Sequence, residues 1–310
     1  MASTKSRFRQ FTDEQWERIE PLLPSNEGRQ GHPFGDNRKV VEGIIYRYRA
    51  GIPWRDLPRE EFGPWQTVWK RHARYSRDGT WDRILQQILV GADSAGMIDW
   101  NVSVDATICR AHQHATKTRP APSRTQGARA NHKNQPPEEC EPAGHGIGRS
   151  RGGLTTKIHS AVDGRGRPLA NVITGGQRND GAMLPEVLAD IAVPRRGPGR
   201  PRTRPDAVIA DKAYSSGITR RELRRRRIDA VIPDKSGTIA ARKRRGSKGG
   251  RPPKFDADLY KHRNVVERSF ALAKQWRALA TRYDKHAVIY RGAVTLCAIL
   301  TWLRQIGDTP

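Results

Sequence analysis

The chain has 310 residues with 57 Lys and Arg against 32 Asp and Glu, which gives a formal charge of +25 at pH 7. This surplus, on a chain whose hydrophobic content of 35% can still build a core, indicates a folded protein with a polyanionic partner, most simply nucleic acid. Three scattered cysteines exclude a disulfide framework, and the longest apolar stretch, at 292–303, is too short to span a bilayer.

The first hundred residues have the pattern of a small helical region. Thr12 and Gln15 have the spacing of a capping box at the start of the first helix. A second helix is expected near 38–50, where Gly51 closes it, and a fourth near 80–95. This part of the chain is therefore expected to be all-α.

The third helix of this region is expected to begin near Pro64, because proline favours the first turn of a helix. A compact helical unit with a basic third helix is typical of a helix-turn-helix-like DNA reader. A plain helical bundle with solvated arginines is the alternative. On the DNA-binding interpretation, residues 1–100 form a DNA-binding domain in which Lys70, Arg71 and Arg74 contact DNA.

From residue 101 the sequence alternates between short apolar runs and amphipathic segments, which predicts a sheet with helices on its faces. Two of the apolar runs end in an acid, at Asp105 and at Asp211. The expected strands are 102–104, 154–162, 168–174, 207–210 and 229–232, and the expected helices are 180–191, 217–227 and 287–306. Basic stretches without periodicity are expected to be flexible insertions, near 113–150, 195–204 and 236–256.

The stretch from Tyr260 to Lys274 carries four polar side chains at helical spacing. At 100° per residue, Tyr260, Arg263, Glu267 and Lys274 share an arc of about 60°, and apolar residues cover the other side. One helix can therefore bury one face and direct a carboxylate flanked by cations at a single point. Such a group suits a metal ion that holds a phosphate.

Three motifs of the chain, in this order, resemble those of the insertion-sequence DDE transposases of the IS-four/IS-five superfamily, and most closely its IS-five branch. The spacing Tyr-x2-Arg-x3-Glu-x6-Lys is similar to the family's carboxy-terminal motif. The segments NVSVDATICRAHQH around Asp105 and DAVIADKAYSS around Asp211 are similar to its two aspartate motifs, as is the connecting stretch GRSRGGLTTKIHSAVDGRGRPL. The similarity runs from roughly residue 10 to residue 305.

The order of strands and helices, with this resemblance, implies an α/β fold of ribonuclease-H-like type. We expect a catalytic domain over residues 101–310, built on a mixed five-stranded sheet with flanking helices, after the small all-α domain. Only 55 residues separate Asp211 from Glu267, which leaves no room for the large β-rich insertion that some members of the family carry there.

The resemblance also implies the chemistry. By resemblance Asp105 bridges two Mg²⁺ ions, for which Mn²⁺ can substitute, while Asp211 and Glu267 each complete one metal site. The enzyme would hydrolyse phosphodiester bonds at the ends of its element and transfer the 3′-hydroxyl ends into target DNA. Two other acids have structural explanations, since Asp163 lies in an expected hairpin turn and Asp180 at an expected helix start.

Further DNA contacts are expected outside the helical region: Tyr260, Arg263, Lys274, His112, His114, Arg200 and Arg251. The last two lie in Gly-Arg-Pro sequences, which fit either a minor-groove hook or a flexible basic linker along phosphates. Cys109, His112 and His114 resemble half of a zinc site, with Cys140 and His145 as possible partners, but the spacing matches no standard zinc finger and zinc is disfavoured.

The expected partners are double-stranded DNA, as transposon ends and as target, and a second copy of the chain on that DNA. The start of the chain lacks the apolar run of a secretory signal, so we expect a bacterial cytoplasmic, nucleoid-associated protein with no membrane partner and no small-molecule substrate. Two alternatives remain open, namely a domesticated DNA-binding regulator and a structure-selective nuclease with the same core.

Overall fold

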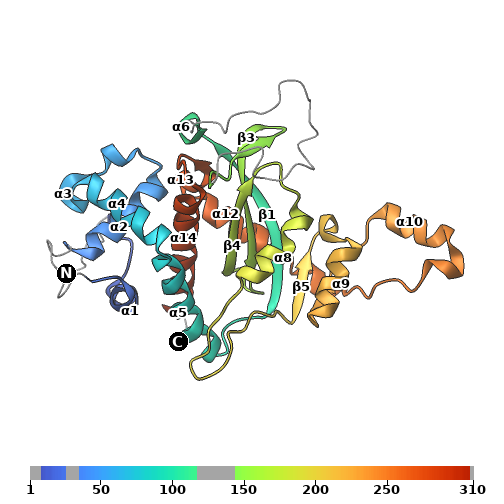
Figure 1. Ribbon diagram of the computed structural model, residues 1–310. Coiled ribbons are helices and arrows are strands. Elements are labelled where there is room, and N and C mark those ends of the chain that lie inside the picture. Colours follow the sequence, from blue (N-terminus) through green and yellow to red (C-terminus); the bar gives the residue numbers. More distant parts are fainter. Residues whose placement is uncertain (1–7, 26–34, 117–143, 308–310) are drawn as a thin grey trace.

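The structure, a computed structural model, describes residues 8–25, 35–116 and 144–307. Helices form the amino-terminal part, and a mixed sheet with helices on both faces follows (Figure 1). The amino-terminal elements are α1 (Asp13–Ile19), η1 (Glu20–Leu22), α2 (Asn37–Ala50), η2 (Trp54–Asp56), α3 (Arg59–Phe62), α4 (Trp65–Arg77) and α5 (Thr80–Ser94). The helices expected from the sequence in this region are all present, and Gly51 closes α2 in the left-handed conformation.

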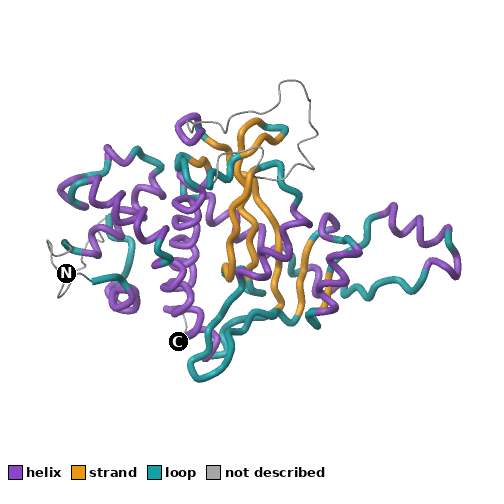
Figure 2. The backbone as a smooth tube through the Cα atoms, viewed as in Figure 1, coloured by secondary structure: helices purple, strands orange, loops and turns teal. Residues whose placement is uncertain are grey.

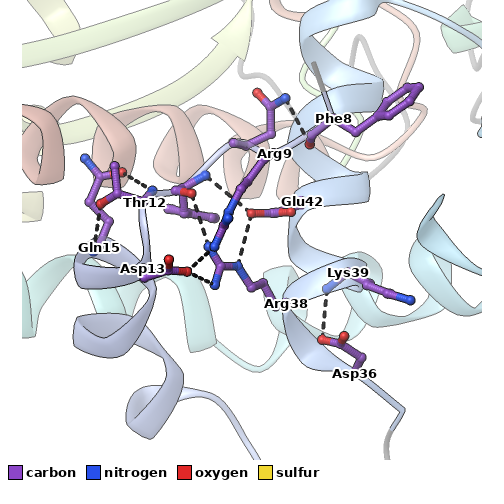
Figure 3. Close-up of polar contacts among 11 residues, drawn as sticks. Phe8, Arg9, Thr12, Asp13, Gln15, Asp36, Arg38, Lys39 and Glu42 are labelled. Carbon is purple, nitrogen blue, oxygen red and sulfur yellow. Dashed lines mark hydrogen bonds and ion pairs between the residues drawn. The ribbon is translucent and has the colours of Figure 1, made fainter. Parts of the chain in front are cut away.

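The start of α1 is fixed by the capping box that the sequence predicts. The Thr12 hydroxyl accepts a hydrogen bond from the Gln15 amide at 3.2 Å, and the Gln15 side chain accepts one from the Thr12 amide at 3.1 Å. Arg38 of α2 donates to Asp13 at 2.6 Å and to Glu42 at 3.3 Å (Figure 3). Arg38 therefore ties α1 to α2, and its hydrogen bond is the main cause that lowers the pKa of Asp13.

Five strands form the body of the sheet in the order β4-β3-β1-β5-β6. Their bounds are β1 (Asn101–Ala111), β3 (Gly153–Val162), β4 (Pro168–Gly175), β5 (Ala207–Ala210) and β6 (Asp229–Val231). The first three pair antiparallel, whereas β5 is parallel to both β1 and β6. The expected mixed five-stranded sheet is confirmed, with two short additions: β2 (Gly148–Ser150) pairs with β3, and β7 (Thr281–Arg282) pairs with β1.

Alternation along β3 shows which helices cover which face of the sheet. Ile158 and Ser160 line a small cavity together with residues of α12 (Asn264–Lys274) and α14 (Ala287–Gly307). Lys157 points the other way and forms an ion pair with Asp180 at the start of α8 (Asp180–Asp190). The remaining elements of this part are α6 (Gln113–Thr116), η3 (Lys212–Tyr214), α9 (Gly217–Arg225), α10 (Ser236–Arg244), η4 (Gly246–Gly249), α11 (Ala257–Lys261) and α13 (Arg277–Ala280).

One large buried cluster runs from the amino-terminal helices through the sheet and into α14. Trp16, Tyr48 and Trp81 of the helical region belong to it, as does Trp302 of α14. By length and composition α14 could cross a membrane, but most of it is buried inside the protein. It is therefore the central core helix, and the amino-terminal helices pack against it.

The segment expected to be one helix from Tyr260 to Lys274 is interrupted, so this prediction was wrong in detail. Helix α11 ends at Lys261 and α12 begins at Asn264. The amide of Arg263 bonds to the carbonyl of Tyr260, three residues back, at 3.0 Å. A tight 3₁₀-type turn therefore separates Tyr260 from the other polar residues of the motif.

Four further expectations need correction. The first strand, expected to be short and to carry Asp105, is longer than predicted and continues to Ala111. Asn179, not Asp180, caps α8, because its side chain accepts from the Ala182 amide at 3.2 Å. The basic stretch 236–256 contains α10 and η4 and is not a continuous loop. Finally, α6 and β2 lie within 113–150, and residues 117–143 of that stretch lie outside the described residues.

Candidate active site

Asp105 and Asp211 lie side by side at neighbouring positions of two parallel strands. Val104 of β1 pairs with Ala210 of β5, and each is followed directly by one of the two acids. Paired positions on adjacent strands lie about 5 Å apart. Asp211 also caps η3, since its side chain accepts from the Ala213 amide at 2.7 Å. The parallel pairing of β1 and β5 is therefore what brings together two acids that are far apart in the sequence.

The carboxyl group of Asp105 is partly buried, and burial is the main cause that raises its pKa. Hydrogen bonds from the Ala106 amide, at 2.8 Å, and from Arg263, at 2.7 Å, act in the opposite direction. The negative charge of Asp211 raises the pKa further. A nearby cation therefore favours the ionised form of Asp105.

Arg263 is that cation in this structure, and it links Asp105 to Glu267. One guanidinium nitrogen lies 2.7 Å from the Asp105 carboxylate, and the other binds the carboxylate of Glu267 one turn further along α12. Burial lowers the pKa of Arg263, but the two carboxylates outweigh it and the net shift is upward. Arg263 and Glu267, both from the expected motif, are thus linked to Asp105 of β1 by one guanidinium.

Within the described ranges, no three side chains of His, Cys, Asp and Glu lie close enough together to hold one metal ion. Two of the three carboxylates, those of Asp105 and Glu267, bind the guanidinium of Arg263 instead. Their oxygen ligands nevertheless have the chemistry that Mg²⁺ prefers. The structure therefore pairs Asp105 and Glu267 with one arginine, and Asp211 follows the strand next to that of Asp105.

The other residues of the carboxy-terminal motif lie at the edges of this cluster. Lys274 donates to the carbonyl of Ile108 on β1 at 3.1 Å. Tyr260 packs against a small apolar cluster of β5 and β6, and its ring lies 5.3 Å from that of Phe255. Lys274 is thus tied to the strand of Asp105, whereas Tyr260 is tied to the strand that ends at Asp211.

His112 and His114 lie beyond the far end of β1. Their rings are 4.8 Å apart, and the ring of His112 also lies 4.6 Å from that of Tyr283. Cys109 is buried, and burial raises the pKa of its thiol. Cys140, one of the two possible partners in the disfavoured zinc site, lies outside the described residues.

The three cations predicted on the basic helix α4 have different environments. Lys70 and Arg74 are exposed, whereas Arg71 is buried. The Arg71 guanidinium donates to Asn37 at 2.7 Å and to the hydroxyl of Tyr75 at 3.1 Å. Arg71 is therefore a packing residue that joins α4 to α2, and it leaves the set of expected DNA contacts. Arg200 and Arg251, in their basic stretches, are exposed.

A second polar cluster lies on the opposite face of the sheet and was not predicted from the sequence. Lys157 donates to Asp180 at 2.8 Å, and His159 lies 3.9 Å from the same carboxylate. Burial lowers the pKa of His159 to about 4 despite this acid. Lys157 and His159, two positions apart in the expected strand 154–162, were the available signal for a polar face.

Tyr214 connects this cluster to the two aspartates. It is buried, and its hydroxyl has no hydrogen-bond partner within the part of the chain that the structure describes. Burial, followed by the charges of Asp105, Asp180 and Asp211, raises the pKa of Tyr214. The side chain is therefore a neutral hydroxyl donor beside three carboxylates.

Comparison with known proteins identifies the family of the chain. Residues 11–85 match the family described as "Putative transposase of IS4/5 family", and residues 99–302 match "Transposase DDE domain". The chain is 36% identical over 149 residues to a putative transposase for insertion sequence element IS402 of Burkholderia cepacia. That alignment covers 47% of this chain and 63% of the relative.

Two more relatives are similar to the chain. The putative transposase for insertion sequence element IS6501 of Brucella ovis is 30% identical over 151 residues, which are 49% of this chain and 100% of that protein. The uncharacterized protein y4sN of Sinorhizobium fredii is 37% identical over 110 residues, 35% of this chain and 82% of that protein. DDE transposase domains generally use divalent metals. The chain therefore belongs to the DDE transposases of IS4/5 type and is a DNA transposase.

Proposed function

We propose that the protein binds the terminal inverted repeats of its insertion sequence, hydrolyses phosphodiester bonds at the element ends and transfers the 3′-hydroxyl ends into target DNA. The observation that supports this proposal is the arrangement around Asp105. Asp211 directly follows β5 beside Asp105 of β1, and Arg263 ties Glu267 to Asp105. Metal-dependent phosphoryl transfer requires carboxylates that lie near one another in this way.

Asp105, Asp211 and Glu267 would hold two Mg²⁺ ions, with Mn²⁺ as a substitute. The residues fit such ions, because the donor set is oxygen only and the partly buried Asp105 already binds a cation at 2.7 Å. When bound, the metal would neutralise charge on the attacking and leaving oxygens of the phosphodiester.

Arg263 has a second role in this proposal. Its guanidinium competes with any other cation for Asp105 and Glu267. Once it leaves them, its planar fork can bind a DNA phosphate through two hydrogen bonds. Lys274 donates to a neutral carbonyl of β1 and forms no ion pair with the residues that the structure describes, so its charge would suit another phosphate. Tyr214 stays protonated and supplies a hydroxyl beside Asp105 and Asp211.

The remaining DNA contacts are proposed from exposure and charge. In a DNA-binding domain of residues 1–100, Lys70 and Arg74 would lie on the exposed side of α4, where they suit contacts to the repeats. Residues 101–310 would form the catalytic domain. His112 and His114 at the end of β1, Tyr260 beside β5, and the exposed Arg200 and Arg251 would contact the DNA backbone. A homodimer would hold two ends together, and we place the enzyme in the bacterial cytoplasm at the nucleoid.

A strand-transfer assay tests the proposal. Purified protein is incubated with Mg²⁺, labelled DNA from both ends of its element, and a supercoiled plasmid as target. We expect cut ends followed by joined products. A structure-selective nuclease would cut branched DNA and never join it. A regulator without chemistry would bind the ends and leave them intact, and either result would overturn the proposal.

A further inference from the structure

Residues 235–255, which we call the arm, leave the body of the protein on the side opposite to helices α1–α5 (Figures 1 and 2). The arm contains α10 and η4, and none of its residues is buried. Helix α10 also lacks a side-chain hydrogen bond at its amino-terminal cap. Because isolated short helices are marginal in water, a helix without a packed face suits docking onto a partner.

The composition of the arm indicates the chemistry of that partner. The arm contains no Asp or Glu and eight cations, namely Lys235, Arg242, Lys243, Arg244, Arg245, Lys248, Arg251 and Lys254. It also contains no Asn or Gln, the side chains that read adenine by paired hydrogen bonds. A run of cations with small residues between them fits phosphates, which carry no sequence information.

The root of the arm is fixed although the rest is exposed. Asp234 accepts hydrogen bonds from Arg220 of α9, at 2.9 Å, and from Arg242 of α10, at 2.6 Å. At the tip, a Cβ on Gly249 would lie 2.3 Å from the Arg242 carbonyl oxygen, so only glycine permits this close return of the chain. The arm is thus a defined projection anchored at its base.

The arm lies in the chain between the two halves of the candidate active site. It follows β6, which pairs with the strand that ends at Asp211, and it leads through α11 into the helix of Glu267. The arm and helix α4, which carries the proposed repeat contacts, lie on opposite sides of the sheet (Figure 1). Two different duplexes could therefore be held by separate parts of the protein.

We propose that the arm holds the target duplex by its phosphate backbone, without reading its sequence, while the amino-terminal helices hold the element end. This assignment rests on the proposed function, because only a strand-transferring enzyme needs a second duplex. It identifies the arm as the site of target capture.

A matched pair of full-length variants tests this assignment. The arm variant carries Lys243→Gln, Arg244→Gln and Arg245→Gln, and the control carries Arg221→Gln, Arg224→Gln and Arg225→Gln on the nearby α9. All six positions are exposed, and glutamine supports a helix about as well as lysine or arginine. Binding to a duplex that lacks the element ends is measured at several salt concentrations, and the strand-transfer assay follows cutting and joining separately.

For the unrelated duplex, the slope of the logarithm of the binding constant against the logarithm of the salt concentration should be less steep in the arm variant. The three lost cations should reduce this slope by about two to three, at about 0.9 per lost phosphate contact. It should cut element ends within twofold of the parent and join them at least tenfold more slowly. The control should match the parent in all three measurements.

Equal behaviour of the two variants would overturn the assignment. Cutting that falls together with joining would also overturn it, because the arm would then hold the element end and not the target. If the parent binds DNA through the arm but never cuts element ends, the proposed function fails, and target capture fails with it.

Discussion

Arginines serve opposite purposes in the core and in the arm. In the core, the buried guanidinium of Arg282 donates to the carbonyls of Gly146 and Asp284, each at 2.8 Å. In the arm, Arg244 and Arg245 are exposed. A formal charge of +25 therefore does not locate a DNA-binding surface by itself. Burial and hydrogen-bond partners separate the cations that hold the fold from those that are free to bind phosphates.

The largest expected difference between core and arm arginines is in their effect on stability, and removal of a core arginine tests it. Arg282→Met should lower the free energy of unfolding by about 3 kcal/mol or more, because several buried acceptors lose a charged donor. Urea denaturation measures the change, with Arg244→Gln in the arm as the control. A core variant as stable as the arm variant would contradict the division between the two groups of arginines.

Acid should weaken the packed regions through two buried histidines. Burial lowers the pKa of two histidines to about 4, namely His72 on α4 and His159 on β3. A histidine in the unfolded chain titrates near 6.5. Between these values the unfolded chain binds more protons, so the free energy of unfolding falls as the pH drops from about 6.5 towards 4. Each histidine should cost on the order of 1–3 kcal/mol.

Unfolding curves for the parent and a His159→Asn variant, measured from pH 7 to 4.5, check this expectation. The variant should lose less stability than the parent over that range. Parallel curves would show that His159 does not contribute.

Two adjacent residues of α4, the buried Arg71 and the exposed Lys70, test the same division between packing cations and DNA-binding cations. Arg71→Gln should cost about 1–2 kcal/mol of stability, because it removes the bonds to Asn37 and Tyr75. Lys70→Gln should leave stability within about 0.5 kcal/mol and reduce the salt slope of repeat binding by about one. Denaturation and binding on the same preparations separate the two effects. Reversed outcomes would place Arg71, and not Lys70, on the DNA surface.

Local rules predicted much of the fold. Capping by Thr12, closure of α2 by Gly51 and the hairpin turn at 163–166 follow from side-chain chemistry within a few residues. The order of strands also led to the mixed sheet. The interruption before Asn264 was missed, because helical spacing records which face a residue occupies and not whether the backbone tightens between turns.

The candidate site was predicted in part. Spacing along the chain led to Arg263 and Glu267, but not to Arg263 lying between two carboxylates, since that contact crosses from α12 to β1. Arg71 is held by Asn37 of α2. The raised pKa of Tyr214 depends on burial and on carboxylates from three separate parts of the chain. These features arise from tertiary packing, which a local pattern does not record.

The most direct test of the account concerns Glu267, whose only described link to Asp105 runs through Arg263. Excision of the element is measured for the parent and for Glu267→Gln, with binding to the element ends as a check of folding. We expect the Glu267→Gln variant to bind the element ends as the parent does and to excise the element about a thousandfold or more slowly. Excision at the parent rate by a folded Glu267→Gln protein would contradict it.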